Sequence, residues 1–313
     1  MHSDDGILCL IYMAQIVIGV FGNGLLFYIY TSNIISPQRI KSIYVIFINL
    51  AFSNIVMIFS RGLPWAIHYC IKKIFLSDIG CKIIVYLQRV SRGISLCITC
   101  LMSVFQAITI SSGGPILAEL KVRAQKCIVP SCVFIWVLNL LIDGVVPLLV
   151  TGIRNNTNSN LNRNIGLCSI EKYAMTTLKL LIWKSLYDTV FVGLMAITTG
   201  YMVLILYRHH CQVKHIHNTS LAPSSSTETR ATKVIIFLMS IFVCSYSVSS
   251  IFVIVMDNSK NINPRMLHIS VVFASFYPTI SPFLLISSYS QSPNFFKAFK
   301  KMKMSYHRGL RTK

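Results

Sequence analysis

Seven apolar runs, each of about 20 residues or more, dominate the sequence. A hydrocarbon core about 30 Å thick is crossed by about 20 helical residues, so each run is long enough to span a bilayer. A backbone in lipid must satisfy its own hydrogen bonds, and a helix does so within one segment. The sequence therefore predicts an all-α bundle of seven transmembrane helices. The expected spans are 7–30, 42–63, 82–110, 127–150, 180–207, 233–256 and 267–288.

The charge of the chain argues against a soluble domain and against a nucleic-acid-binding protein. Charged residues make up 12% of the sequence, which is about half the share found in soluble domains. Lys and Arg outnumber Asp and Glu by 29 to 9. Such an excess indicates nucleic acid or an anionic membrane face as a partner, and the seven apolar runs favour the membrane. We expect the lipid bilayer, and no nucleic acid, as a partner.

The orientation of the bundle is predicted from the Lys and Arg of the connecting segments. The six residues before the first run include Asp4 and Asp5 and lack the basic region of a signal peptide. Placing the N-terminus outside gives the cytoplasmic segments the larger share of Lys and Arg. We therefore expect a multi-pass plasma-membrane protein with an extracellular N-terminus and a cytoplasmic C-terminus. Residues 1–288 would form the membrane domain, and residues 289–313 a basic tail with a short amphipathic helix.

Two features are expected in the external loops. Cys81 begins the third span and Cys168 lies in the long fourth loop, on the side where disulfides are stable. A bridge between them is the favoured interpretation, although Cys70 is a competing partner because sequence does not fix connectivity. Asn155 opens an Asn-Asn-Thr acceptor sequon in the fourth loop and is expected to carry a glycan.

A group of polar residues lies inside the predicted spans, where charge is costly and side chains face the bundle interior. At about 1.5 Å per residue, Arg89 lies about 12 Å below Cys81, and two acids lie at a similar depth. Lys184 is expected nearer the surface, with its ammonium group in water. The group is interpreted either as a ligand pocket or as structural pairing between helices. Its members are Gln88, Arg89, Arg92, Asp143 and Asp188.

Sequence patterns for catalysis are missing. The chain has no Gly-rich phosphate loop, no GxSxG motif and no HExxH motif. Four histidines between residues 209 and 217 could bind a metal ion, but a solvated basic loop is the favoured interpretation. We expect no enzyme activity, no cofactor and no metal site.

Several motifs resemble those of known receptors. Gly22-Asn23 and Trp136 resemble residues of rhodopsin-like receptors, and Asn49-Leu50-Ala51-Phe52-Ser53-Asn54 resembles their Asn-Leu-Ala-x-x-Asp. Asn54 replaces the acid of that motif, which argues against a sodium site. The third span ends without an Asp-Arg-Tyr motif. The departures and the longer motifs resemble vomeronasal type 1 (pheromone) receptors: Asp78-Ile79-Gly80-Cys81-Lys82, Arg89-Val90-Ser91-Arg92-Gly93, Gly200-Tyr201-Met202-Val203 and Ser281-Pro282-Phe283-Leu284-Leu285-Ile286.

This resemblance covers nearly the whole chain and implies the rhodopsin-like G-protein-coupled receptor architecture. It implies a receptor of vomeronasal sensory neurons that detects pheromones or other small chemosignals and signals through an inhibitory-class heterotrimeric G protein. Phe105, Gln106 and Thr109 would face the G protein, and their uncharged stretch implies a lock other than an acid–Arg pair. A bitter-taste receptor, which would lack the external cysteine pair, and a transporter, which would show inverted repeats, are the alternatives.

Overall fold

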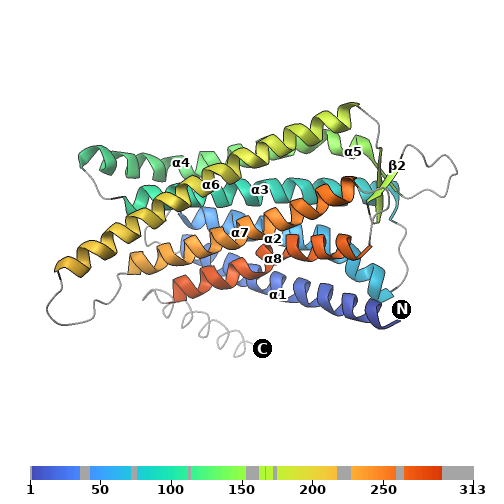
Figure 1. Cartoon of the computed structure of the whole chain (residues 1–313), viewed down its shortest axis with the longest axis horizontal. Coiled ribbons are helices and arrows are strands. Elements are labelled where there is room, and N and C mark those ends of the chain that lie inside the picture. The colour runs from blue at the N-terminus through green and yellow to red at the C-terminus, as the bar shows by residue number, and fades with distance from the viewer. Residues whose placement is uncertain are drawn as a thin grey trace.

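The computed structural model describes residues 2–35, 43–71, 76–111, 114–152, 162–165, 167–171, 175–216, 227–258 and 264–290. Seven long helices form one elongated bundle (Figure 1), and all seven contain a stretch apolar and long enough to cross a membrane. The predicted all-α transmembrane fold is thus confirmed. The helices are α1 (His2–Ile35), α2 (Ile43–Ile71), α3 (Asp78–Ile110), α4 (Pro115–Ile142), α6 (Met175–Ile216), α7 (Thr227–Asn258) and α8 (Pro264–Ser290).

A short, partly non-helical segment connects α4 to α6. It consists of the 3-10 helix η1 (Asp143–Val145), the one-turn helix α5 (Val146–Leu149) and the strands β1 (Val150–Gly152), β2 (Asn162–Ile165) and β3 (Cys168–Glu171). The strands form an antiparallel sheet in the order β1-β3-β2. The sheet and the N-terminus lie at the same end of the bundle (Figure 1). We call this end the sheet end, and the other the opposite end.

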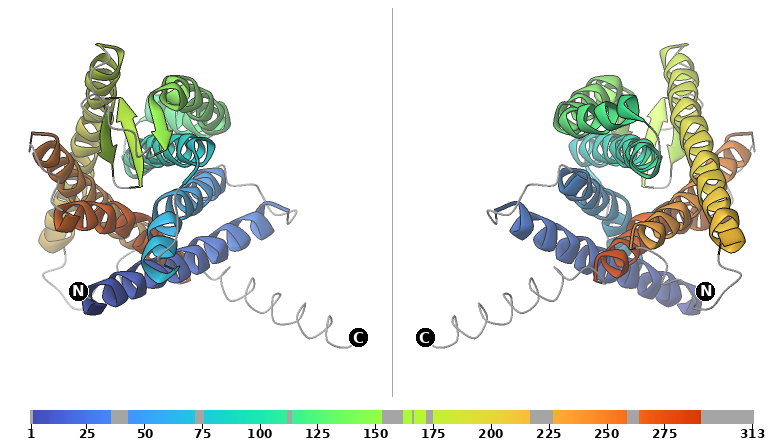
Figure 2. Two further views of the ribbon diagram at one scale, coloured as in Figure 1. Left: turned by 90° about the vertical axis from the view of Figure 1, so that its right-hand side faces the viewer. Right: turned by 90° about the vertical axis from the view of Figure 1, so that its left-hand side faces the viewer.

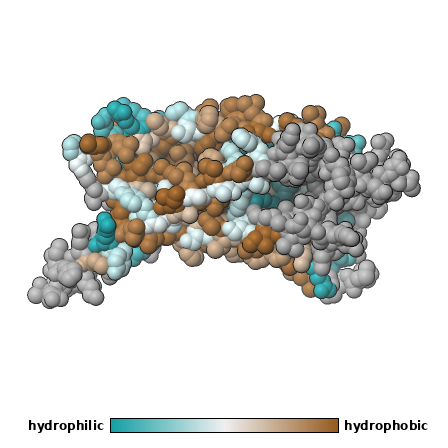
Figure 3. Space-filling model, turned by 45° about the horizontal axis from the view of Figure 1, so that its top comes forward, coloured by the Kyte–Doolittle hydropathy of each residue, from teal (hydrophilic) through white to brown (hydrophobic). Residues whose placement is uncertain are grey.

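The helices bury one another around α3. Most of the membrane-length part of α3 is buried, whereas that of α6 is mainly exposed, and the end-on views show α3 among the other helices (Figure 2). The outer surface is apolar over much of the visible face, with polar residues near the ends (Figure 3). Such a surface suits lipid rather than water. Large exposed apolar side chains include Leu10, Leu141, Leu148, Val190 and Ile197.

Several helix boundaries differ from those expected. The expected loop 111–126 is mostly helical, because Pro115 occupies the first turn of α4, where its missing N–H is not needed. Helix α2 continues past Pro64 and the expected end of the span at residue 63, as far as Ile71, and Arg61 within it is buried. The fourth loop contains the sheet, which was not predicted. Residues 291–313 of the expected amphipathic tail lie outside the described residues.

Candidate ligand-binding site

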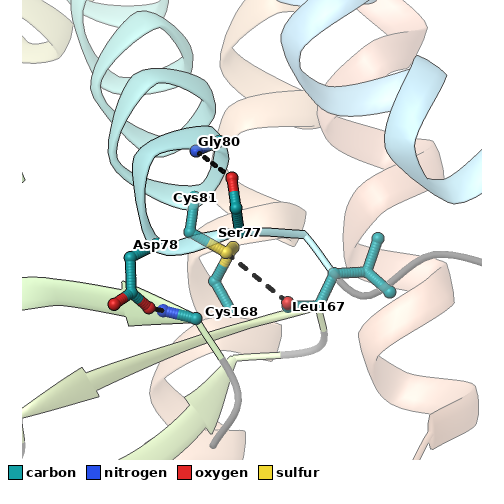
Figure 4. The surroundings of a disulfide bond; sticks show 7 residues. Ser77, Asp78, Gly80, Cys81, Leu167 and Cys168 are labelled. Carbon is teal, nitrogen blue, oxygen red and sulfur yellow. Dashed lines mark hydrogen bonds between the residues drawn. A yellow bond between two sulfur atoms is a disulfide. The ribbon is translucent and has the colours of Figure 1, made fainter.

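A disulfide fixes the sheet to the start of α3. Cys81 and Cys168 are bridged and buried, which confirms the predicted pair (Figure 4). The Asp78 carboxylate accepts a hydrogen bond of 2.7 Å from the backbone N–H of Gly152, next to the bridge. A Cβ at Gly152 would lie 2.8 Å from that carboxylate and 3.0 Å from a backbone carbonyl, so glycine allows the close approach. The sheet therefore covers the mouth of the bundle at a fixed position.

A second disulfide joins Cys9 of α1 to Cys70 of α2 at the same end. The sequence analysis treated Cys70 only as a competitor for Cys81 and did not predict this bridge. The available signal was position: Cys9 lies near the start of the first span, and Cys70 follows the second span. Adjacent antiparallel helices bring such residues together, so the two cysteines form a natural pair.

The first charged group of the interior is centred on Asp143, in η1. Asp143 is 1% exposed. Its two carboxylate oxygens pair with Arg89 Nε at 3.2 Å and with Lys184 Nζ at 3.1 Å. The Lys184 ammonium group is therefore directed inward, and the expectation that it reaches water is wrong. This triad joins α3, η1 and α6 through one buried carboxylate.

The second charged group lies on another face of α3. The guanidinium of Arg92 lies 4.3 Å from the ring centroid of Tyr246, on α7. The Tyr246 hydroxyl donates a hydrogen bond to the Asp188 carboxylate, on α6. Gln88 is partly buried, and its backbone carbonyl accepts a hydrogen bond from Ser91. The four charged residues predicted as one group are thus divided between two.

A cavity opens beside the second group, between α2, α3, α7 and α8. Its empty volume is about 340 Å³, including the opening. Arg92 lines it, whereas the other four residues of the predicted pocket are not among its described lining residues. Sequence reasoning missed the serines and aromatic rings of α7 and α8, whose apolar spans gave no signal of a site. The remaining polar and aromatic lining consists of Ser95, Phe242, Ser245, Tyr246, Ser249 and Tyr277.

Next to the cavity, which Ser95 also lines, four neutral side chains form what we call the asparagine network: Asn23, Asn54, Ser95 and Ser281. The Asn54 amide donates to Asn23 Oδ1 at 3.2 Å and to Ser281 Oγ at 3.0 Å, and its oxygen accepts from Ser95 at 3.2 Å. Both amide N–H groups of Asn54 are thus used. The network joins α1, α2, α3 and α8 without any charged group.

At the opposite end, α3 is held by neutral hydrogen bonds. Gln106 is 7% exposed and donates to the Thr232 hydroxyl of α7 at 3.1 Å. Phe105 is partly buried and packs against the main hydrophobic core. Thr109 is exposed, and its hydroxyl donates to the Phe105 carbonyl of its own helix at 2.7 Å. Of the three residues predicted to face a G protein, Thr109 is thus the exposed one.

The seven-helix bundle and its motifs define a rhodopsin-like G-protein-coupled receptor. The fold is similar to that of squid rhodopsin, with a TM-score of 0.71 at 17% sequence identity, over 96% of this chain and 81% of that chain. Residues 8–298 match the Vomeronasal organ pheromone receptor family. The chain therefore belongs to the vomeronasal type 1 receptor family and is a chemosensory receptor.

Individual relatives agree with this family. Vomeronasal type-1 receptor 4 of Homo sapiens is 36% identical over 278 residues, which cover 88% of this chain and 92% of that protein. Vomeronasal type-1 receptor 3 of Homo sapiens is 36% identical over 296 residues, which cover 94% of each. Olfactory receptor class A-like protein 1 of Danio rerio is 29% identical over 279 residues, which cover 88% of this chain and 87% of that protein.

Proposed function

We propose that this receptor detects a pheromone or related small chemosignal at the plasma membrane of vomeronasal neurons and signals through an inhibitory-class heterotrimeric G protein. The observation that carries the proposal is the cavity, which lies between four helices and is lined by Arg92 on α3. A ligand there contacts α7 and α8 as well as α3. Differential binding to two arrangements of these helices would shift their populations.

The sheet end is extracellular in this proposal, with the N-terminus outside and the C-terminus in the cytoplasm. Both disulfides lie at the sheet end, and disulfides persist on the oxidising side of a membrane. Asn155, which lies outside the described residues, follows β1 in the sequence and would carry an extracellular glycan. Staining of an N-terminal epitope in intact cells tests the orientation. Glycosidase treatment tests the glycan: it should lower the mass of the receptor but leave that of the Asn155→Gln variant unchanged.

The two charged groups take different roles. Arg92 contacts the ligand, and Asp188 holds the Tyr246 ring that forms the wall beside it. Gln88 lies one turn before Arg92 on α3, towards the sheet end, and would contact a larger ligand. Arg89 and Asp143 support the pocket from behind, through their ion pair.

The G protein binds at the opposite end, where Phe105, Gln106 and Thr109 lie. The hydrogen bond from Gln106 to Thr232 ties α3 to α7 and serves as the lock of the inactive state. A neutral hydrogen bond contributes about 1 kcal/mol, so this lock is weaker than an ion pair in a buried site. Ligand binding at the sheet end would open it.

Signalling in transfected cells tests the ligand and the G protein together. Cells that express the receptor are challenged with fractionated urine and a steroid panel, and inhibition of cyclic AMP is measured with and without pertussis toxin. We expect a toxin-sensitive response whose potency falls more in Arg92→Ala than in Lys184→Ala, because Lys184 pairs with Asp143 away from the cavity. Equal losses in two variants with equal surface expression would argue against the pocket.

A further inference from the structure

A histidine of α8 joins three helices near the sheet end. His268 is 8% exposed, and both of its ring nitrogens have hydrogen-bond partners. Nδ1 bonds to the Tyr12 hydroxyl of α1 at 2.9 Å, and Nε2 bonds to the Tyr69 hydroxyl of α2 at 2.7 Å. One imidazole therefore holds α8 against both α1 and α2. We call His268 and the two tyrosines the histidine clamp.

The two tyrosines are fixed relative to each other, whereas α8 is not covalently bound to either of them. Tyr12 lies one turn after Cys9, and Tyr69 directly precedes Cys70, so the disulfide between these cysteines ties α1 to α2 beside the clamp. The rings of Tyr12 and Tyr69 also stack, with their centroids 6.3 Å apart. Helix α8 contains no cysteine. Its attachment to the tyrosine pair therefore depends on noncovalent contacts.

A neutral imidazole matches the two hydroxyl groups of the clamp. It has one N–H donor and one nitrogen acceptor, so one hydroxyl accepts from the ring and the other donates to it. A second proton turns both nitrogens into donors. The hydroxyl that donated to the ring then needs a new acceptor for its hydrogen, and the ring carries a positive charge in a buried position. Both changes weaken the clamp.

The surroundings of His268 do not offset that charge. None of the ion pairs within the described residues includes His268. The Trp65 ring stands edge to face with the imidazole at 5.1 Å, but such a contact stabilises a cation by less than its burial costs. The described contact of α7 at this level is neutral and joins Ser249 to Ser270. The titratable and charged groups nearby are Asp5 and Tyr12 of α1, Arg61, His68 and Tyr69 of α2, and Arg265 of α8.

We propose that His268 is a proton-sensitive switch, in which protonation of the imidazole releases α8 from Tyr12 and Tyr69. The released arrangement binds the proton better, so acidification shifts the population towards it. Ala274 and Tyr277 of α8 line the cavity, about 9–14 Å along the helix from His268. Release of α8 therefore alters the cavity, and external acid weakens the ligand response. The effect on the ligand rests on the proposed receptor function, whereas the release of α8 does not.

The fluorescence of Trp65 tests the release directly, because its ring stands beside His268. The purified receptor in phosphatidylcholine nanodiscs is titrated from pH 7.5 to pH 5, the range in which imidazole ordinarily takes up a proton. We expect a step in the emission that disappears in His268→Gln, which keeps a donor and an acceptor but does not titrate. His68→Gln is the matched control and should keep this step. A step that persists in His268→Gln, or no step in the wild type, would overturn the proposal.

Signalling in cells tests the consequence for the ligand. The potency of the most active compound of the steroid panel is compared at pH 7.5 and pH 5.5. We expect acid to weaken it about fivefold in the wild type and to leave it unchanged in His268→Gln. Tyr69→Phe lacks one bond of the clamp, so it should show the weaker potency already at pH 7.5, and it carries the test if His268→Gln does not reach the cell surface. Acid that strengthens the response, or a Tyr69→Phe receptor that behaves as the wild type, would overturn the proposal.

The two measurements separate this inference from the proposed function. An emission step that requires His268, in a receptor that no chemosignal activates, would support the switch and remove the proposed function. A receptor that a chemosignal activates with the same potency at both pH values, and that shows no such step, would keep its function and remove the switch.

Discussion

Replacing Asp143 by asparagine should destabilise the receptor more than any other single change in its charged groups. The carboxylate is buried and holds two cations at 3.2 and 3.1 Å. At an effective dielectric constant of about 20, each contact near 3 Å contributes roughly 5 kcal/mol of attraction before desolvation. Desolvation offsets much of this attraction. Removal of one partner from a buried pair costs about 3–5 kcal/mol, because the remaining charge stays buried.

The expected effect is a fall in the unfolding temperature of the purified receptor of about 5–10 °C. Lys184→Met, combined with Asp143→Asn, should recover part of this loss, because the double variant leaves one uncompensated cation instead of two. The matched control is Glu119→Gln. Glu119 also pairs with an arginine, Arg123, at 2.6 Å, but both side chains are more than half exposed. Exposed pairs contribute about 0–1 kcal/mol, so the control should melt like the wild type.

Two results would refute this reasoning. An Asp143→Asn receptor that melts with the wild type would show that the triad contributes no net stability. A double variant that is less stable than Asp143→Asn alone would show that Lys184 stabilises the fold by packing rather than by its charge. A structural role also predicts that ligand potency changes little at equal surface expression, whereas a large loss of potency would place Asp143 in the pocket.

Three further predictions concern the asparagine network, the opposite end of α3 and the two disulfides. Asn54→Asp removes the two hydrogen bonds that the Asn54 amide donates in the asparagine network, so the variant should lose about 2 kcal/mol of stability. Because the variant restores the acid of the rhodopsin-like motif, it should melt earlier in choline chloride than in sodium chloride, whereas the wild type should melt alike in both salts. Gln106→Ala removes one hydrogen bond between α3 and α7, so it should raise the basal inhibition of cyclic AMP by up to about fivefold. Thr109→Ala is the control and should leave the basal signal unchanged, because the Thr109 hydroxyl bonds within its own helix. Cys168→Ser opens a loop with a sequence separation of 87 residues and Cys9→Ser opens one of 61, so each should lower stability by at most about 4–5 kcal/mol. Cys168→Ser should also reduce the ligand response, because the sheet is then no longer bonded to α3.

The sequence predicted depth in the membrane better than direction around a helix. Helical rise gives the level of Arg89 and Arg92 from their distance to Cys81, independent of packing. Direction depends on which neighbour each face meets. Arg89 and Arg92 are three residues apart, so they are separated by about 60° around the helix. That angle directs Arg89 to η1 and Arg92 to α7, and sequence alone could not show where those neighbours lie.

Helix ends were the other source of error. The second span was expected to end at residue 63, although α2 extends to Ile71. In the bundle, α2 continues because Pro64 is buried against neighbouring helices, and Arg61 faces the interior rather than lipid. The sheet was missed because its strands are only three or four residues long, and strand β1 pairs with β3 across an intervening segment.

The contacts along α3 explain how a ligand at the sheet end can affect the opposite end. Its charged contacts lie near the sheet end, and the polar contacts described farther along are neutral hydrogen bonds. Each neutral bond contributes about 1 kcal/mol, so exchanging several of them costs little. A ligand that prefers one arrangement by a few kcal/mol can then change the populations substantially, whereas a buried ion pair at the opposite end would oppose it. The neutral contacts of α3 from Ser95 onward include, in order, Ser95 to Asn54, Cys97 to Tyr187, Thr99 to Tyr277, Ser103 to Thr198 and Gln106 to Thr232, and Ser111, which follows the helix, contacts Tyr201.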